Sequence, residues 1–338
     1  MTQITTTGLD IAKNSFHAMH CNQSGKNIKK KKLSRKQVLE YFATLSAHLI
    51  GIEACSAAHY WARELQKLGH EVRLIAPQFV KPYVRGNKHD YNDAAAIAEA
   101  VTRPEMRFVA IKTVDQHDTQ TLFGIRKRAE KERTAHANMV RGLLAEYGIV
   151  IKQGIHNLYN ELPDILEDAE NHLSPSARGM FQHEYEHLCY LRHRFEMLTA
   201  SITDNARNNG VIERLMSIPG FGPIVASAFY HHVGNGSEFS KGRDVSASIG
   251  IVPRQHSTGG KHNLLGISKR GDKQLRALLI HGARSVLRLV ADKQDKLSVW
   301  ARSVSERRGF NKAAVALANK LARIGWAVTV KNEDYIAA

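Results

Sequence analysis

Two short apolar runs that each end in a carboxylate constrain the fold of this chain most. The first run, Ile-Thr-Thr-Thr-Gly-Leu, ends at Asp10, and the second, Leu-Ile-Gly-Ile, ends at Glu53. Such runs are typical of buried strands. Asp90 and Asp93 stand three positions apart at the start of an alanine-rich segment, so they share one face of a predicted helix. Because two strand ends and one helix face can converge, these four acids predict an α/β domain with a carboxylate cluster.

A cluster of four carboxylates has a clear chemical use. Hard divalent cations such as Mg²⁺ take oxygen ligands, and two metals about 4 Å apart clamp both oxygens of a phosphodiester displacement. The alternative is that each acid caps or flanks its own element, which is the commoner role of any one of them alone. Their shared placement at element ends, in a strongly basic chain, favours a site that binds two Mg²⁺ ions through Asp10, Glu53, Asp90 and Asp93.

The charge balance predicts a polyanionic partner. The 338 residues carry 48 Lys and Arg against 32 Asp and Glu, which gives a formal net charge of +16. Cations that neutralise phosphates release condensed counterions, so nucleic acid fits this surplus. No apolar stretch reaches the roughly 18 residues of a spanning helix, and the N-terminus lacks the features of a signal peptide. Three scattered cysteines indicate a reducing compartment, so we expect a cytoplasmic protein that binds no membrane.

The first of three predicted domains, residues 1–112, has the pattern of an α/β fold. Short β-branched or alternating runs predict five strands, of which the first three form a meander; they lie near residues 4–10, 15–21, 26–32, 49–53 and 71–76. Apolar residues at helical spacing between the later strands predict the helices that cover the sheet.

The second predicted domain, residues 113–209, is a long helical or coiled-coil arm. One helix over 114–147 would be about 45 Å long, and a second over 177–208 would return alongside it. Pro163 and Pro175 are expected to break the segment between these two helices.

Basic residues in these two domains are the predicted contacts to a nucleic-acid backbone. A lysine run lies on the third predicted strand, and a basic face follows the first helix of the arm. The lysine run has an alternative role, because lysine also blunts edge-to-edge pairing of a strand. The predicted contacts are Lys29, Lys30, Lys31, Lys32, Arg126, Lys127, Arg128, Arg133 and Arg141.

The third predicted domain, residues 210–338, is mostly α-helical. Its Pro-Gly-Phe-Gly-Pro segment resembles the turn of a helix-hairpin-helix. Gly220 and Gly222 would let the backbone approach a phosphate, and the helix start that follows offers free N–H groups. The alternative is an ordinary turn between two helices.

A Gly-rich loop in this domain, Gln-His-Ser-Thr-Gly-Gly-Lys, is the second chemical candidate. Its glycines permit tight turns that can hold an anion, and Ser257 lies among cations. A serine hydroxyl needs a base or cationic surroundings to attack phosphorus. The alternative is a phosphate-binding loop without a covalent role, and Ser268 is the rival nucleophile. The basic groups nearby in sequence are Arg254, His256, Lys261, His262, Lys269 and Arg270.

Taken together, these residues resemble a known family. Gly-Leu-Asp10, Glu53 and Asp90-x-x-Asp93 resemble the Asp-Glu-Asp-Asp set of a RuvC-type, RNase H-like domain. The Pro-Gly-Phe-Gly-Pro turn, the loop with Ser257 and the Gly-Ile-Ser-Lys-Arg-Gly segment after it resemble the C-terminal domain of the 110 family of insertion-sequence transposases. The resemblance covers nearly the whole chain in the expected order and is weakest over about 150–210.

This resemblance implies an RNA-guided DNA transposase and recombinase of a bacterial insertion sequence. A structured guide RNA, or bridge RNA, would pair with double-stranded donor and target DNA. The acidic metal site would act with a C-terminal serine, here Ser257, that forms a covalent link to DNA. The resemblance also implies a homo-oligomer, a dimer or tetramer with shared active sites, which works at the bacterial nucleoid. Two other functions stay open: a hydrolytic junction-resolving nuclease and a non-catalytic RNA-binding protein.

Overall fold

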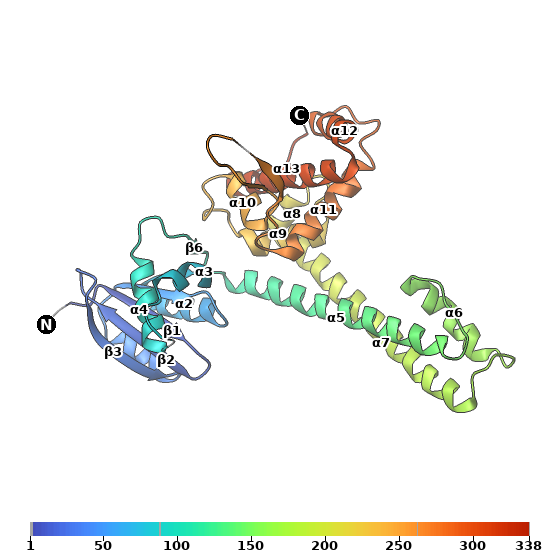
Figure 1. Ribbon diagram of the computed structural model, residues 1–338, viewed down its shortest axis with the longest axis horizontal. Coiled ribbons are helices and arrows are strands. Elements are labelled where there is room, and N and C mark those ends of the chain that lie inside the picture. The colour runs from blue at the N-terminus through green and yellow to red at the C-terminus, as the bar shows by residue number, and fades with distance from the viewer. Residues whose placement is uncertain (1–2, 88, 262, 338) are drawn as a thin grey trace. The chain divides into compact units, whose positions relative to one another are not determined.

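The computed structural model describes residues 3–87, 89–261 and 263–337. The chain forms two compact units, Met1–Thr113 and Val114–Ala338 (Figure 1), and each has its own apolar core. His262, one of the basic groups named near Ser257, lies outside the described residues.

The first unit is built on one mixed sheet. Its strands are β1 (Thr6–Ile11), β2 (Ser15–Cys21), β3 (Asn27–Ser34), β4 (Leu49–Glu53), β5 (Glu71–Ile75) and β6 (Phe108–Val109), in the order β3-β2-β1-β4-β5-β6. The first three strands pair antiparallel, which confirms the predicted meander. β4 and β5 then extend the sheet parallel to β1. The C-terminal ends of β1 and β4 therefore lie side by side at one end of the strands.

Helices cover both faces of this sheet. In chain order, the helices of this unit are α1 (Gln37–Ala43), α2 (Ala58–Lys67), α3 (Pro77–Val80), the short 3-10 helix η1 (Lys81–Tyr83) and α4 (Asp90–Val101). α1 and α2 bury their apolar sides on one face, where Phe16 and Trp61 stack edge to face at 4.9 Å. α4 packs on the opposite face, across β1, β2 and β4.

Two glycines let α4 lie directly against the strands. A Cβ on Gly8 would stand 2.0 Å from the carbonyl oxygen of Ala94, and one on Gly51 would stand 2.8 Å from Cβ of Val101. Any larger residue would push the helix away from β1 and β4. Gly8 therefore brings the start of α4 close to β1, and Gly51 lets the last turn of α4 pack on β4.

A chain of hydrogen bonds runs through buried histidines on the α1 face. Nδ1 of His48 donates to the carbonyl oxygen of Ser46 at 2.7 Å, so its Nε2 accepts from the Thr7 hydroxyl at 2.8 Å. The Thr7 oxygen then accepts from Nδ1 of His20 at 2.8 Å, and Nε2 of His20 accepts from the Tyr41 hydroxyl at 2.8 Å. These hydrogen bonds keep the rings of His20 and His48 neutral, each with its proton on Nδ1.

We expect His20 to stay neutral well below the usual range of histidine. Its pKa is lowered from 6.5 to about 4, first by burial and then by the charges of His48 and Lys29. The unfolded chain binds a proton between these pH values that the folded unit does not. Stability is therefore present above pH 6.5 and is lost as pH falls toward 4, by about 3 kcal/mol at most. Long-range ¹H–¹⁵N NMR should show a neutral Nδ1–H ring at pH 6; a titration midpoint near 6.5 would contradict the hydrogen-bond chain.

The second unit begins with a helical arm. Its helices are α5 (Val114–Ala145), α6 (Ile155–Glu167) and α7 (Pro175–Asn208). α5 and α7 run antiparallel and side by side (Figure 1): Nε of Arg126 donates to Oγ1 of Thr199 at 2.9 Å, and Nε2 of His136 lies 2.9 Å from a carboxylate oxygen of Glu184. Both long helices match the sequence prediction closely.

The predicted break at Pro163 was wrong, because Pro163 lies inside α6. A proline there removes one backbone donor. Leu158 and Leu162 are fully buried in a core shared with α5 and α7, and this burial outweighs the missing hydrogen bond. Pro175 instead occupies the first position of α7, where proline is favoured.

The rest of the second unit is a helical domain with one β-hairpin. Its helices are α8 (Gly210–Leu215), α9 (Pro223–Val233), α10 (Gly242–Ile249), α11 (Lys273–Leu287), α12 (Lys296–Arg308) and α13 (Phe310–Lys331). Between α10 and α11, β7 (Pro253–Gln255) pairs antiparallel with β8 (Leu264–Ile267). The sequence predicted only a Gly-rich loop at this place.

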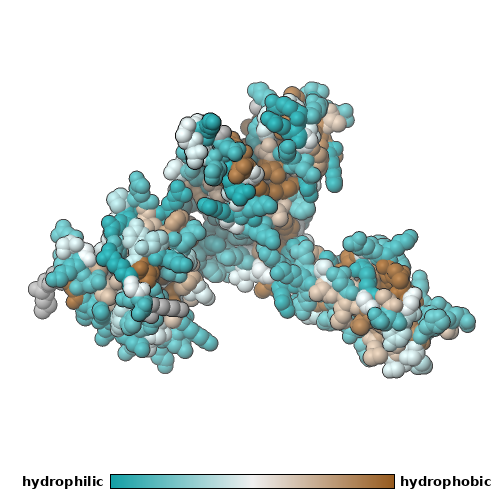
Figure 2. Space-filling view, in the orientation of Figure 1, coloured by the Kyte–Doolittle hydropathy of each residue, from teal (hydrophilic) through white to brown (hydrophobic). Residues whose placement is uncertain are grey.

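The expectation that no stretch is long and apolar enough for a spanning helix was wrong for α13. By length and composition alone this helix of 22 residues could cross a membrane. Eight of its residues are buried, and it packs against α10, α11 and α12, as the core helix of a helical domain does. Most of the visible surface of the protein is hydrophilic (Figure 2).

Candidate active site

The four predicted acids come from three elements of the first unit. Asp10 is the second-last residue of β1, and Glu53 is the last residue of β4. Because side chains alternate along a strand, both project from the face that carries the two glycines under α4. Asp90 and Asp93 lie in the first turn of α4. The structure therefore brings the four carboxylates to one end of the α4 face.

Their charges influence one another. The pKa of Asp10 is raised from 3.8 to about 6, first by burial and then by the negative charges of Asp93, Asp90 and Glu53. Burial and the charge of Asp93 likewise raise the pKa of Glu53. A divalent cation bound between these carboxylates would relieve their mutual repulsion.

His17 belongs to this site, although no pattern in the sequence pointed to it. It pairs in register with Asp10, is buried, and its Nδ1 lies 3.5 Å from a carboxylate oxygen of Asp90. In the part of the chain that the structure describes, the ligand atoms of Asp10, His17 and Asp90 are the one set of three that all lie within 4.8 Å of one another. These donors, two carboxylates and an imidazole, fit a divalent metal ion, with Glu53 and Asp93 close enough to act electrostatically.

The lysine run on β3 is divided between the two faces of the sheet. The ammonium groups of Lys29 and Lys31 lie 5.7 and 5.6 Å from the ring centre of Tyr41, on the face that α1 covers. Lys30 and Lys32 project from the α4 face, where the acids lie. Only two of the four predicted lysine contacts share a face with the carboxylates.

The basic residues of the arm also differ in their surroundings. The guanidinium groups of Arg126 and Arg133 stack on a phenylalanine ring of α7, 4.4 and 4.2 Å from its centre. Arg141 donates to a backbone carbonyl just before α6. Lys127 and Arg128 are exposed, so they are the most accessible of the predicted arm contacts.

The Pro-Gly-Phe-Gly-Pro turn links α8 to α9. Gly220 has a φ of +82°, and a Cβ there would stand 2.8 Å from the carbonyl oxygen of Gly282 in α11. Close packing of this turn on α11 explains the glycine without a ligand. Gly222 is exposed and caps α9, and among the described residues nothing lies within 4 Å of its Cβ position. The accessible backbone of the turn is therefore at Gly222.

Ser257 is exposed in the β7–β8 hairpin. Its hydroxyl oxygen accepts a hydrogen bond from Nε2 of Gln255 at 2.8 Å, a partner that the sequence did not suggest. A bridge between Thr258 and Lys261 closes the turn beyond it. The predicted cations on this hairpin are all exposed: Arg254, His256 and Lys261.

Ser268 lies in a tighter setting at the base of the hairpin. The backbone N–H groups of Ser268 and Lys269 donate to carbonyl oxygens before β7, at 2.8 and 3.0 Å. Arg270 is exposed, and a Cβ on Gly271 would stand 1.7 Å from a carbonyl oxygen of α10. The close packing restricts this segment more than the hairpin turn, which favours Ser257 as the hydroxyl that can approach a phosphate.

A groove of about 1020 Å³ adjoins the same hairpin. Apolar side chains of β8 and a tryptophan of α12 form much of its wall, and cations of α13 border it. The residues that set its character are Leu264, Leu265, Trp300, Lys312, Lys320 and Arg323. A surface that is both apolar and cationic suits nucleic acid.

Comparison with known proteins identifies the family. A sequence profile described as a transposase of the IS116/IS110/IS902 family matches residues 212–297, and a profile for the DEDD transposase domain of IS110 elements matches residues 7–149. A probable family 20 transposase of Pseudomonas aeruginosa is 44% identical over 98% of both chains. The transposase of insertion sequence element IS1111A from Coxiella burnetii is 44% identical over 99% of this chain and 92% of its own.

A third relative extends the pattern. The transposase of IS1328 from Yersinia enterocolitica is 39% identical over 98% of both chains. The match to the DEDD domain means that the first unit has an RNase H-like fold. With two profiles in the expected order and relatives alike over nearly their full length, this chain belongs to the IS110 family of transposases.

Proposed function

We propose that this chain is an RNA-guided recombinase that moves a bacterial insertion sequence by Mg²⁺-dependent DNA cleavage, with Ser257 forming a covalent link to DNA. Membership of the family implies DNA recombinase activity in general. The observation that carries the finer proposal is the convergence of four carboxylates whose repulsion, with burial, raises the pKa of Asp10 to about 6.

The acids would hold two Mg²⁺ ions per site: Asp10, Glu53, Asp90 and Asp93. Hard cations prefer carboxylate oxygens, and when bound they neutralise the charge that develops on a phosphate under attack. His17, pressed against Asp90, would fix the orientation of that carboxylate.

Double-stranded donor and target DNA would contact the second unit. The turn at Gly220 and Gly222, which we propose acts like a helix-hairpin-helix, offers the backbone N–H groups at the start of α9 to a phosphate. The hairpin and its base would add cations at the phosphate that Ser257 attacks. These cations are Arg254, Lys261, Lys269 and Arg270.

The arm would act as a coiled coil that binds the backbone of the guide RNA. We expect the double variant Lys127→Gln/Arg128→Gln to bind guide RNA more weakly, because both side chains are exposed and can reach phosphates. The log–log salt slope of binding should fall by roughly 1.5, from about 0.7 to 0.9 per contact. Arg307→Gln/Arg308→Gln, an exposed pair on α12, is the matched control. An unchanged slope in the arm variant would mean that this face points to solvent.

The protein would work as a homo-oligomer, a dimer or tetramer, at the nucleoid in the bacterial cytoplasm, where DNA is its substrate. The test uses full-length protein with its co-purified RNA, incubated with donor and target DNA in Mg²⁺ or in EDTA. Recombinant product in Mg²⁺ alone, with an RNA that pairs with both DNAs, supports the proposal. Clean cleavage without a covalent adduct favours the hydrolytic nuclease, and RNA binding without any DNA cleavage favours the non-catalytic protein.

A further inference from the structure

A line of cations leads away from the acids along the edge strand β3. Lys32 pairs in register with His17, which itself pairs with Asp10. Two residues on, the ammonium group of Lys30 lies 5.5 Å from the ring centre of Tyr91. Side chains on one face of a strand recur about every 7 Å. The two lysines therefore stand at successive steps from the carboxylates on the same face of the sheet.

Tyr91 ties this line to the acidic site. Its ring lies against His17 edge to face, with centres 5.0 Å apart, and it follows Asp90 directly in the first turn of α4. The ring is thus an apolar surface between the carboxylates on one side and Lys30 on the other. Cations that alternate with aromatic faces are typical of grooves that bind single-stranded nucleic acid.

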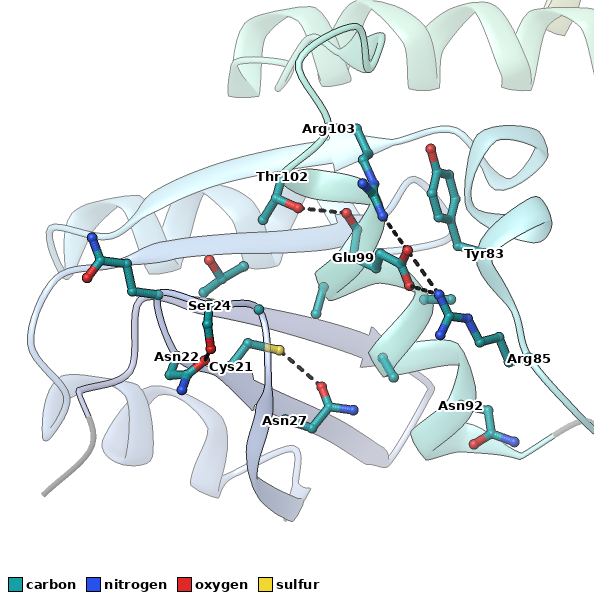
Figure 3. Close-up of a pocket in the computed structure, with 16 residues that line it drawn as sticks. Cys21, Asn22, Ser24, Asn27, Tyr83, Arg85, Asn92, Glu99, Thr102 and Arg103 are labelled. Atoms are coloured by element: carbon teal, nitrogen blue, oxygen red, sulfur yellow. Dashed lines mark hydrogen bonds and ion pairs between the residues drawn. The ribbon is translucent and has the colours of Figure 1, made fainter.

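The same face ends in a polar pocket of about 630 Å³, within the range of about 300 to 1,000 Å³ for ligand sites. The turn after β2, the start of β3 and one side of α4 enclose it (Figure 3). Alanines of α4 give it an apolar wall. Its amide side chains are Asn22, Gln23, Asn27 and Asn92. Amides supply both the donors and the acceptors that a base edge requires.

At the far end of the pocket two guanidinium groups share one carboxylate. Nη2 of Arg85 lies 3.0 Å from Glu99, and Arg103 binds the same carboxylate while its guanidinium lies 5.6 Å from the ring centre of Tyr83 (Figure 3). Arg85 is largely exposed. The group keeps one positive charge in excess, so a phosphate can replace Glu99 as the partner of the arginines.

We propose that the α4 face of β3 is a track for the DNA strand whose phosphate reaches Asp10. Successive phosphates lie on Lys32 and Lys30, and an unstacked base enters the amide-lined pocket. The strand is single there, because the bases of a duplex are stacked and paired and cannot enter a pocket. The inference rests on the proposed function, since it extends the substrate of that same site.

The competing explanation is that the lysines only protect an edge strand from pairing. It treats all four lysines alike, whereas the track involves Lys30 and Lys32 and leaves out Lys29 and Lys31, which face Tyr41. Two double variants of the full chain therefore decide between them: Lys30→Gln/Lys32→Gln and, as the matched control, Lys29→Gln/Lys31→Gln. Both remove two charges from the same exposed strand.

The measurement is anisotropy of a labelled single-stranded DNA oligonucleotide in EDTA, which prevents cleavage, over a range of salt. The track variant should lose about 10-fold or more in affinity at 0.1 M salt, and its salt slope should fall by roughly 1.4, from 0.7 per single-strand phosphate. The control should stay within about 2-fold of wild type. Glu99→Gln should tighten binding several-fold, because it frees both arginines for a phosphate.

Equal losses in the two double variants would overturn the track. Tighter binding of an RNA oligonucleotide of the same sequence, with the same variant pattern, would overturn its assignment to DNA. The proposed function fails separately, if wild-type protein with its RNA yields no DNA cleavage in Mg²⁺, because the binding measurement in EDTA does not depend on cleavage.

Discussion

Asp10→Asn should abolish Mg²⁺-dependent DNA cleavage, by about 10³-fold or more. Asp10 is the carboxylate on which the other three acids act, and it lies in the close group with His17 and Asp90. A neutral amide binds a divalent cation more weakly than a carboxylate does, so the site would lose cations that neutralise the phosphate, at a cost of roughly several kcal/mol in the transition state. The plasmid cleavage assay measures it. Glu71→Gln, at the start of β5, is the control and should retain wild-type rates. Wild-type cleavage by Asp10→Asn would rule out the metal site.

The same substitution should stabilise the metal-free protein. The pKa of Asp10 is about 6 in the folded chain against 3.8 ordinarily, so the folded state binds more protons between these values. The contribution of Asp10 to stability therefore falls as pH rises from about 4 to 6 and stays low above that. Asparagine does not titrate, so the variant should gain about 1 to 2 kcal/mol at pH 7.5, after discounting the full shift for solvent screening.

Thermal unfolding in EDTA at two pH values tests this gain. The difference between variant and wild type should be clear at pH 7.5 and nearly absent at pH 4, where Asp10 is protonated. Comparing the two proteins at each pH cancels the opposite trend from His20. Equal melting temperatures at pH 7.5 would mean that neither burial nor the neighbouring acids raise the pKa of Asp10. A site that destabilises the free protein and needs a cation is a common exchange of stability for function.

Much of the fold follows from local patterns. Leu49–Glu53 forms a strand with the predicted bounds, and the long helices of the arm follow from periodic apolar residues over 30 or more positions. The β7–β8 hairpin could not be predicted, because its strands are short and mostly exposed and so carry no apolar alternation. Pro163 is the opposite case. Proline locally disfavours a helix, but tertiary burial overrides that preference and Pro163 lies inside α6.

The acids could be predicted because each ends a strand or begins a helix, which depends only on local sequence. His17 could not, because in a strand with one buried face the apolar Phe16 and Ala18 would take the buried side and leave His17 to solvent. Side chains on both faces of β2 are buried, since α4 covers the second face. The division of the lysine run has the same cause. Which set of alternate residues in a strand faces the site depends on where α4 packs, and that depends on Gly8 and Gly51.

Ser257→Ala should eliminate both the covalent protein–DNA adduct and the recombinant product, by about 10³-fold or more. Binding of RNA and of metal should be retained, because the hairpin turn is exposed and its pairing does not need the hydroxyl. Gln255 donates a hydrogen bond to the Ser257 oxygen, and during the attack a base would take the hydroxyl proton.

The chemistry explains why the nucleophile matters. As Oγ of Ser257 bonds to phosphorus, the bond from phosphorus to the leaving deoxyribose oxygen breaks; the serine proton goes to a base, and the leaving oxygen gains a proton. The phosphodiester is exchanged for a protein–DNA ester of similar energy, so a DNA hydroxyl can later displace the serine and rejoin the strands without ATP. Attack by water would release that energy, and a recombinase could not rejoin its ends.

Ser268→Ala is the matched control, and it should spare the adduct, because the packed base of the hairpin holds Ser268 away from an incoming phosphate. The measurement is denaturing electrophoresis of labelled DNA after incubation with protein, guide RNA and Mg²⁺, in which an adduct migrates as a shifted band that protease removes. A band that persists in Ser257→Ala and disappears in Ser268→Ala would transfer the role to Ser268. Clean cleavage products with no shifted band in any variant would make water the nucleophile, and the hairpin would then serve only to bind a phosphate.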